Sequence, residues 1–185
     1  MGEEIELETR KKIYNFIQEH PGTHEREISR RLDIPLSTLD YHLHLLSRRD
    51  LISAFEDGHY KKYYATGKIS VKEKKIIGIL RQKVKRKIII FLLLNPNSTH
   101  KKICEYIDLA PSTTSFHLNI LVDLELIKRN LIGRETEYYV ENPEYISDLV
   151  LTYKKSFVDD MVERFADAWL DLHPKNIRKQ KKGKK

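Results

Sequence analysis

The sequence predicts a mainly α-helical chain with small β-hairpin wings, an α+β fold made of two copies of one unit. When the chain is shifted by 75 residues, the stretch 10–67 aligns with 85–142 without a gap, and 16 of the 58 pairs are identical. Each copy has segments with the helical spacing of apolar residues, followed by strand-forming residues around a turn glycine. A period of this length indicates two similar small domains and not a solenoid.

The first copy begins with three predicted helices. His20-Pro21-Gly22 ends the first of them, because proline cannot continue a helix. Thr23 is expected to cap the second. The three helices are expected at residues 6–19, 23–32 and 37–48.

The third helix of this copy has one apolar face. Leu39, Leu43 and Leu46 are spaced at i, i+4 and i+7, which predicts a buried stripe, and the residues between them are expected to face outward. A short helix with one buried and one hydrogen-bonding face suits reading of the DNA major groove. After it, Asp57-Gly58 lies between strand-forming runs and predicts a β-hairpin. Three helices followed by a hairpin predict a winged helix.

The second copy repeats this order, with helices expected at 98–107 and 111–121 and a hairpin around Gly133. Between the copies, apolar residues at strict i+4 steps predict one continuous helix of about 24 residues that runs from residue 71 into the second copy. The predicted domains are a winged helix at 6–67, a basic helical connector at 68–84, a second winged helix at 85–142, a long amphipathic helix at 143–172 and a disordered basic tail at 173–185.

The C-terminal amphipathic helix has two interpretations. It either lies back on its own winged helix or joins two chains, and the sequence does not decide between them. Homodimers are common among DNA-reading helix-turn-helix proteins, so a homodimer through residues 143–172 is one of the two expectations.

Composition limits the class of protein. The lone Cys104 excludes an intrachain disulfide and favours a reducing compartment. The longest apolar run, 88–94, is too short to cross a bilayer, which needs about 20 residues. We therefore expect a cytoplasmic protein without a membrane partner. The net charge is +7, and residues 174–185 carry seven Lys or Arg and no acid, so the rest of the chain sums to zero. A solvated basic surface with a disordered tail would also explain this distribution.

Both copies contain the pattern Ser-Thr-x-x-x-His-Leu-x-x-Leu, followed five residues later by Leu-Ile. This pattern resembles the recognition helix of winged helix-turn-helix regulators of the ArsR/MarR type. The tandem arrangement with a long acidic C-terminal helix looks like archaeal transcriptional regulators of that group. The resemblance implies a sequence-specific transcriptional regulator that binds double-stranded DNA, is often a dimer and is not an enzyme. No cofactor is expected, and the small-molecule or metal effector is unknown.

The chain departs from the family pattern at a few positions. Asp50 and Glu125 replace the glycine that normally ends the third helix. Because aspartate tolerates a left-handed conformation better than glutamate, the second unit is expected to end this helix differently. Thr114 stands where Leu39 packs in the first copy, and a looser second core is expected. Pro35 and Ala110 occupy the place of the usual capping serine.

The outward positions of the two third helices are the candidate base contacts. They are Ser37, Thr38, Asp40, Tyr41, His42 and His44 in the first unit, and Pro111, Ser112, Thr113, Ser115, Phe116, His117 and Asn119 in the second. Asn119 is the best candidate for adenine, whose N6 and N7 suit a carboxamide. Alternatively, Tyr41 and Phe116 pack against the first helix of their unit.

Basic side chains are the candidates for phosphate and wing contacts. They are Arg30, Arg31, Arg48, Arg49, His59, Lys61, Lys62, Lys101, Lys102 and Arg134. Lys101 and Lys102 are informative because the dipole disfavours positive charge in the first turn of a helix, and a bound phosphate would reverse this cost. Surface lysines in a solvated first turn are the simpler alternative.

Other classes of function fit less well. The sequence contains neither a glycine-rich phosphate loop nor a carboxylate pair in an apolar setting, so it does not suggest catalysis. No metal site is assigned, because a metal sensor built from Cys104, His100 and His117 would lack the usual ligand spacing. The main rival is a winged-helix interaction module of the transcription machinery that does not itself read DNA. The outward face of the third helix discriminates between the two, because DNA reading is blocked if the C-terminal helix or the connector buries its polar residues.

Overall fold

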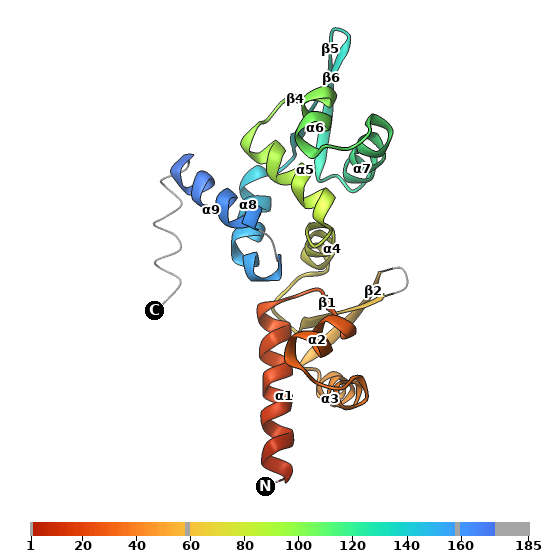
Figure 1. The fold of residues 1–185 in the computed structure, drawn as a ribbon, viewed down its shortest axis with the longest axis vertical. Coiled ribbons are helices and arrows are strands. Elements are labelled where there is room, and N and C mark those ends of the chain that lie inside the picture. The colour runs from red at the N-terminus through yellow and green to blue at the C-terminus, as the bar shows by residue number, and fades with distance from the viewer. Residues whose placement is uncertain (1, 58–59, 158–159, 173–185) are drawn as a thin grey trace. The chain divides into compact units, whose positions relative to one another are not determined.

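The computed structural model describes residues 2–57, 60–157 and 160–172 (Figure 1). In these residues the chain is mostly helical with two small antiparallel sheets, which confirms the predicted fold class. It divides into two compact units, Met1–Arg81 and Gln82–Lys185. The predicted tail, 173–185, lies outside the described residues. No helix in the described part of the chain is both long and apolar enough to cross a bilayer.

Unit 1 is a three-helix winged helix with an additional helix at its end. Its elements are α1 (Gly2–Glu19), β1 (Thr23–His24), α2 (Glu25–Leu32), α3 (Leu36–Arg48), β2 (Ile52–Asp57), β3 (Tyr60–Ala65) and α4 (Val71–Leu80). The predicted hairpin is β2–β3, and β1 adds a third strand with Thr23 opposite Tyr63. Thr23 is therefore a strand residue and not the expected N-cap. His24 caps α2, and its Nδ1 accepts from the Glu27 backbone N–H at 3.2 Å.

The core of unit 1 lies between these helices and the sheet. The predicted stripe of α3 is confirmed, since Leu39, Leu43 and Leu46 are buried. They pack in one cluster with Ile13 and Ile17 of α1. Burying side chains of this kind contributes roughly 1.5–3 kcal/mol each. The stripe therefore fixes which face of α3 points away from the protein.

Unit 2 repeats this architecture residue by residue. Its elements are α5 (Lys83–Leu94), β4 (Ser98–Thr99), α6 (His100–Ile107), α7 (Pro111–Asp123), β5 (Ile127–Ile132), β6 (Glu135–Val140), α8 (Pro143–Thr152), the 3₁₀ turn η1 (Lys154–Ser156) and α9 (Asp160–Leu172). From β4 to β6, every bound lies 75 residues after its counterpart in unit 1. The strand order β4-β6-β5 also matches β1-β3-β2.

The two third helices end alike, contrary to the expectation from Asp50 and Glu125. Both residues adopt the left-handed conformation, with φ of 53° and 56°. The backbone N–H that follows each of them donates to the carbonyl of a leucine in the last turn, Leu46 or Leu121. Because these closing bonds are identical, the turn tolerates glutamate as well as aspartate.

The predicted continuous connector helix is wrong. α4 ends at Leu80, and α5 starts at Lys83 after an extended Gln82. α4 is fixed to unit 1, where the Tyr64 hydroxyl donates to the Lys74 carbonyl at 3.1 Å and Lys74 Nζ donates to Ser53 Oγ at 2.8 Å. The apolar residues at i+4 steps are thus buried in two separate cores, those of α4 in unit 1 and those of α5 in unit 2. Their spacing therefore does not require a single helix.

The segment 143–172 is also not one helix. α8 and α9 are separated by a 3₁₀ turn, and residues 158–159 lie outside the described residues. Both helices bury their apolar stripe within unit 2, where α9 packs against α5 and α8. At the turn, Phe157 is buried beneath the Arg86 guanidinium, 5.4 Å from its ring centroid. A single straight helix would carry its second half away from this surface. The packing therefore favours the interpretation in which the segment lies on its own winged helix.

Candidate nucleic-acid interface

The exposed face of α3 carries most of the candidate base contacts of unit 1. α3 begins after Pro35 without a side-chain cap, and its first turn contains no acid. Its first backbone N–H groups are left without helical partners, which suits an anion such as phosphate. Five of the six predicted residues are exposed on this helix: Ser37, Thr38, Asp40, Tyr41 and His44.

His42 was predicted to face outward, and this is wrong. Its side chain is only 2% exposed and lies on the same face of α3 as Leu39 and Leu46. The reason is helical spacing, since position 42 lies three residues after Leu39 and four before Leu46. Among the described residues its Nδ1 has no hydrogen-bond partner. Burial, then the charge of Arg10 on α1, lowers the pKa of His42, although Glu6 opposes the shift.

α7 presents the corresponding face in unit 2. Pro111, Ser112, Thr113, Phe116 and Asn119 are exposed on it. Thr114 is fully buried, and its Oγ1 has no hydrogen-bond partner within the described chain. A hydroxyl without a partner in the core is unfavourable. The core of unit 2 is therefore less well satisfied at this position than that of unit 1, where Leu39 packs.

Ser115 and His117 turn toward the protein and are only half-exposed. The Ser115 hydroxyl lies 2.8 Å from His100 Nε2 of α6, so it is already engaged. The Nδ1 of His117 is buried without a partner in the described residues. Burial, then the charge of Lys85, lowers the pKa of His117. Both residues are poorer base-contact candidates than the exposed ones.

Tyr41 and Phe116 occupy the same repeat position and are both strongly exposed, at 51% and 61%. The alternative that they pack against the first helix of their unit is therefore wrong. Each ring lies edge-to-face with the histidine that follows it, with centroid distances of 5.2 and 5.4 Å. A large aromatic group in water on this face is available for contact with a base or a thymine methyl group.

The candidate phosphate contacts of unit 1 are not all equally available. Arg30, Arg48 and Arg49 are exposed. Arg31 is held by Glu27 at 3.8 Å, and its guanidinium lies 5.1 Å from the centroid of the Phe16 ring. Arg31 therefore makes contacts within unit 1, although it is also an exposed cation.

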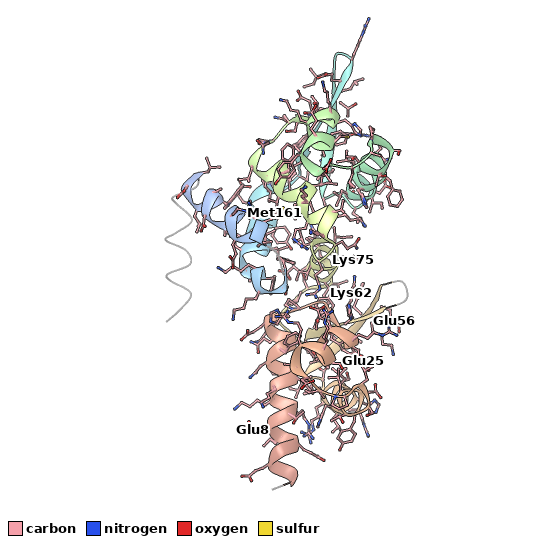
Figure 2. All side chains as sticks on the ribbon, in the orientation of Figure 1. Glu8, Glu25, Glu56, Lys62, Lys75 and Met161 are labelled. Atoms are coloured by element: carbon pink, nitrogen blue, oxygen red, sulfur yellow. The ribbon has the colours of Figure 1, made fainter. Side chains whose placement is uncertain are left out.

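The wings and α6 carry the remaining basic candidates. Lys62 on β3 and Glu56 on the neighbouring strand β2 are labelled in Figure 2. Lys61 is exposed and Lys62 is half-buried, and Glu56 is paired with Lys61 across the hairpin. Arg134 is exposed at the turn of the second wing, whereas His59 lies outside the described residues. In α6, Lys101 and Lys102 are exposed in the first turn, whose N-cap is Thr99.

Sequence reasoning missed three exposed apolar residues near these faces. Leu36 starts α3 and is exposed beside Ser37. Leu131 and Ile132 are exposed at the tip of the second wing, Leu131 by 75%. Two adjacent exposed aliphatic residues next to the turn glycine interrupt the expected strand alternation, and this signal was available in the sequence.

Each unit places a histidine of the third helix near a cation of the first helix, and the two pairs, Arg10–His42 and Lys85–His117, lie at matching repeat positions. His42 is buried, and His117 is half-exposed with a buried Nδ1. Because both folded-state pKa values lie below 6.5, the unfolded chain binds more protons as pH falls below that value. We therefore expect stability to drop from about pH 7 to about pH 5. Urea unfolding of the wild type and of His42→Gln checks this, and an equal loss in both proteins would exclude a contribution from His42.

The metal-sensor alternative requires a cluster of metal-ligating side chains. In the described ranges, no group of three or more His, Cys, Asp or Glu residues could hold a metal ion. Cys104 Sγ lies 3.5 Å from His100 Nδ1, and the other ring nitrogen of His100 is bonded to Ser115.

Comparisons with known proteins agree with this architecture. Residues 7–77 match a family described as an N-terminal HTH domain, and residues 83–129 match the family described as bacterial regulatory protein, arsR family. The "Uncharacterized HTH-type transcriptional regulator MJ1398" of Methanocaldococcus jannaschii is 31% identical over 133 residues, which cover 72% of this chain and 33% of that protein. The chain thus spans about a third of the length of this relative.

Solved structures resemble the chain only loosely. The transcriptional regulator SlyA is 14% identical, with 57% of this chain and 82% of that chain covered and a TM-score of 0.36. A mutant of ZitR from Lactococcus lactis is also 14% identical, with 76% and 96% covered and a TM-score of 0.35. Scores this low add nothing to the assignment. The two family matches show that the chain carries two helix-turn-helix domains, the second of which matches the arsR family, and the archaeal relative that the chain resembles is named an HTH-type transcriptional regulator.

Proposed function

We propose that the chain is a sequence-specific transcriptional regulator that binds double-stranded DNA through two non-identical recognition helices, α3 and α7. One observation carries the proposal. At the same repeat positions, both helices bury two leucines, Leu43 and Leu46 in α3 and Leu118 and Leu121 in α7, and expose a polar and aromatic face. A regulator of this kind acts on the chromosome, so we expect it in the cytoplasm.

The rival is an interaction module that does not itself read DNA. DNA reading would be blocked if the C-terminal helix or the connector covered the polar face of these helices. Within each unit this face is open, with Tyr41 and Phe116 the largest exposed side chains on it. This exposure supports DNA reading over the rival.

The two faces should prefer different half-sites. His44 of α3 corresponds to Asn119 of α7, and Tyr41 corresponds to Phe116. The carboxamide of Asn119 suits adenine. The phenyl ring of Phe116 lacks the hydroxyl of Tyr41 and offers only apolar contact, for example with thymine methyl groups. Arg48, in the last turn of α3, is exposed on the face of Tyr41 and His44 and could contact guanine. The other exposed positions of both faces offer no arginine, so hydroxyl, aromatic and amide contacts would set the preference there. We therefore expect an asymmetric DNA site.

The experiment that tests the proposal is a binding-site selection with the full chain from random duplexes, followed by fluorescence anisotropy at several salt concentrations. We expect an enriched sequence that binds at least about 10³-fold more tightly than random duplex at the same salt. Equal binding of all duplexes would leave only the charge-driven contribution and refute sequence reading.

Asn119→Ala tests the best single base contact. We expect the variant to lose about 1–3 kcal/mol of discrimination at one base pair and to keep its preference elsewhere, because only one bidentate contact is removed. A repeated selection measures this directly. Asn15→Ala is the matched control, since Asn15 is an exposed helical asparagine on α1. Uniform weakening at every position would contradict the assigned role.

A homodimer through residues 143–172 remains a prediction with a restricted surface. Most of the apolar stripe is buried within unit 2, and among the described residues of this segment the large apolar side chains left exposed are Tyr145 and Leu172. A dimer would have to use this remainder. Light scattering of the full chain decides the matter, because a monomeric mass at micromolar concentration ends the dimer hypothesis.

A further inference from the structure

Unit 2 contains a pocket that the recognition helices do not use. It measures about 580 Å³ and lies between α5, β6, the start of α8 and α9. This volume lies inside the range of roughly 300–1,000 Å³ that is usual for small-molecule sites. Its walls include Leu92 and Leu93 of α5, Tyr139 of β6 and Trp169 of α9.

The charge of the pocket has one sign. Its two ionisable carboxylates are Glu141, at the end of β6, and Glu144, in the first turn of α8. Among the described residues that line it, none is basic. Glu141 already binds an exposed cation, because Lys128 Nζ donates to its Oε1 at 2.6 Å. The charge of Glu141 is therefore partly compensated, and a cationic ligand would have to replace or join the lysine there.

We propose that this pocket is a binding site for a small hydrophobic cation, an aromatic or aliphatic body that carries one positive charge. The apolar walls would bury the body, and Tyr139 and Trp169 would present ring faces or edges to it. Glu141 and Glu144 would attract the charge and disfavour an anion of the same shape. The site lies apart from α7 and does not depend on DNA binding.

The chain provides its own reporter. Trp169 is the single tryptophan, it is 2% exposed, and it lines the pocket. Excitation of tryptophan therefore reports on the pocket and on no other site. Tetraphenylphosphonium and tetraphenylborate form a suitable pair of probes, because they have the same shape and opposite charge.

The test is a titration of the full chain with each probe, followed by tryptophan fluorescence in sodium buffer. We expect tetraphenylphosphonium to change the fluorescence saturably, with a dissociation constant at least about tenfold lower than that of tetraphenylborate. The net charge of +7 favours the anion, so a preference for the cation must come from the local carboxylates. Equal or tighter binding of the anion would overturn the proposal.

Glu141→Gln and Glu144→Gln, combined in one variant, separate charge selection from apolar binding. We expect cation binding to weaken by about tenfold or more, while the emission without probe stays as in the wild type. Glu135→Gln is the matched control on β6, exposed and outside the pocket. Unchanged cation binding in the double variant would refute the site. A concentration-dependent emission change without probe would assign the pocket to a second copy of the chain and would also refute it.

Discussion

Phe165→Ala should lower the free energy of unfolding of unit 2 by about 3–5 kcal/mol, as is usual when a buried phenylalanine is truncated. Phe165 is almost completely buried on α9, and its ring centroid lies 5.5 Å from that of Trp169. The truncation removes contacts between α9 and the rest of unit 2, so it leaves a cavity that the helix cannot easily close. Urea unfolding followed by Trp169 fluorescence measures the loss in unit 2 specifically.

Leu172→Ala is the control for this prediction. Leu172 lies on the same helix and is 63% exposed, so its truncation should change stability by at most about 0.5 kcal/mol. The comparison also separates the two interpretations of the C-terminal segment. If α9 served mainly to join two chains, Phe165→Ala would reduce the mass in light scattering and leave the monomer stable. A loss in unit 2 below about 1 kcal/mol would contradict the packing described here.

The repeat made most of the fold predictable. Identity at spaced positions such as Pro21/Pro96 and Gly58/Gly133 located the breaks and turns, and the bounds from the short first strand to the second hairpin strand then differ by the same 75 residues. Each third helix could be oriented because Leu39, Leu43 and Leu46 define a face. Local spacing and turn chemistry thus sufficed within each unit.

Spacing was insufficient where two periodic segments meet. The connector and the segment 143–172 both show apolar residues at helical intervals, yet each is broken. Periodicity records which side of a helix is buried, and it does not record whether the surface that buries it continues in a straight line. In α4 the decisive contacts are those with Tyr64 and Ser53, which are distant in sequence.

The candidate site was partly mispredicted for a related reason. His42 and His117 are polar, so they were assigned to the outer face, although their positions lie next to the leucine stripe. A hydrophobic stripe in a short helix is wide enough to include such neighbours. Reading the angle of each position, and not its polarity, would have placed both histidines correctly.

Arg81→Met should cost unit 1 about 3 kcal/mol or more at pH 7, because it leaves the Glu27 carboxylate buried without its main cation. Arg81 is the C-cap of α4, donates to Glu27 of α2 and donates to the Pro21 carbonyl at 3.5 Å. A Cβ atom at Gly22 would lie only 3.1 Å from Arg81 Cδ, so this arginine is closely packed. In unit 2 the position of Glu27 is taken by Lys102, and this pair has no counterpart there.

The pH dependence of this loss gives a sharper test. Burial by itself raises the pKa of Glu27, but the charge and hydrogen bond of Arg81 help to bring it below the ordinary 4.5. A carboxyl with a lowered folded-state pKa stabilises above pH 4.5 and loses that contribution as pH falls through the folded value. The difference between wild type and Arg81→Met should therefore be largest near pH 7 and shrink below pH 4.5. Far-UV circular dichroism during urea unfolding measures this difference, once the transition reported by Trp169 is assigned to unit 2.

Glu27→Gln combined with Arg81→Met should recover part of the loss, because no buried charge remains. A constant difference across this pH range would show that Arg81 acts through packing alone.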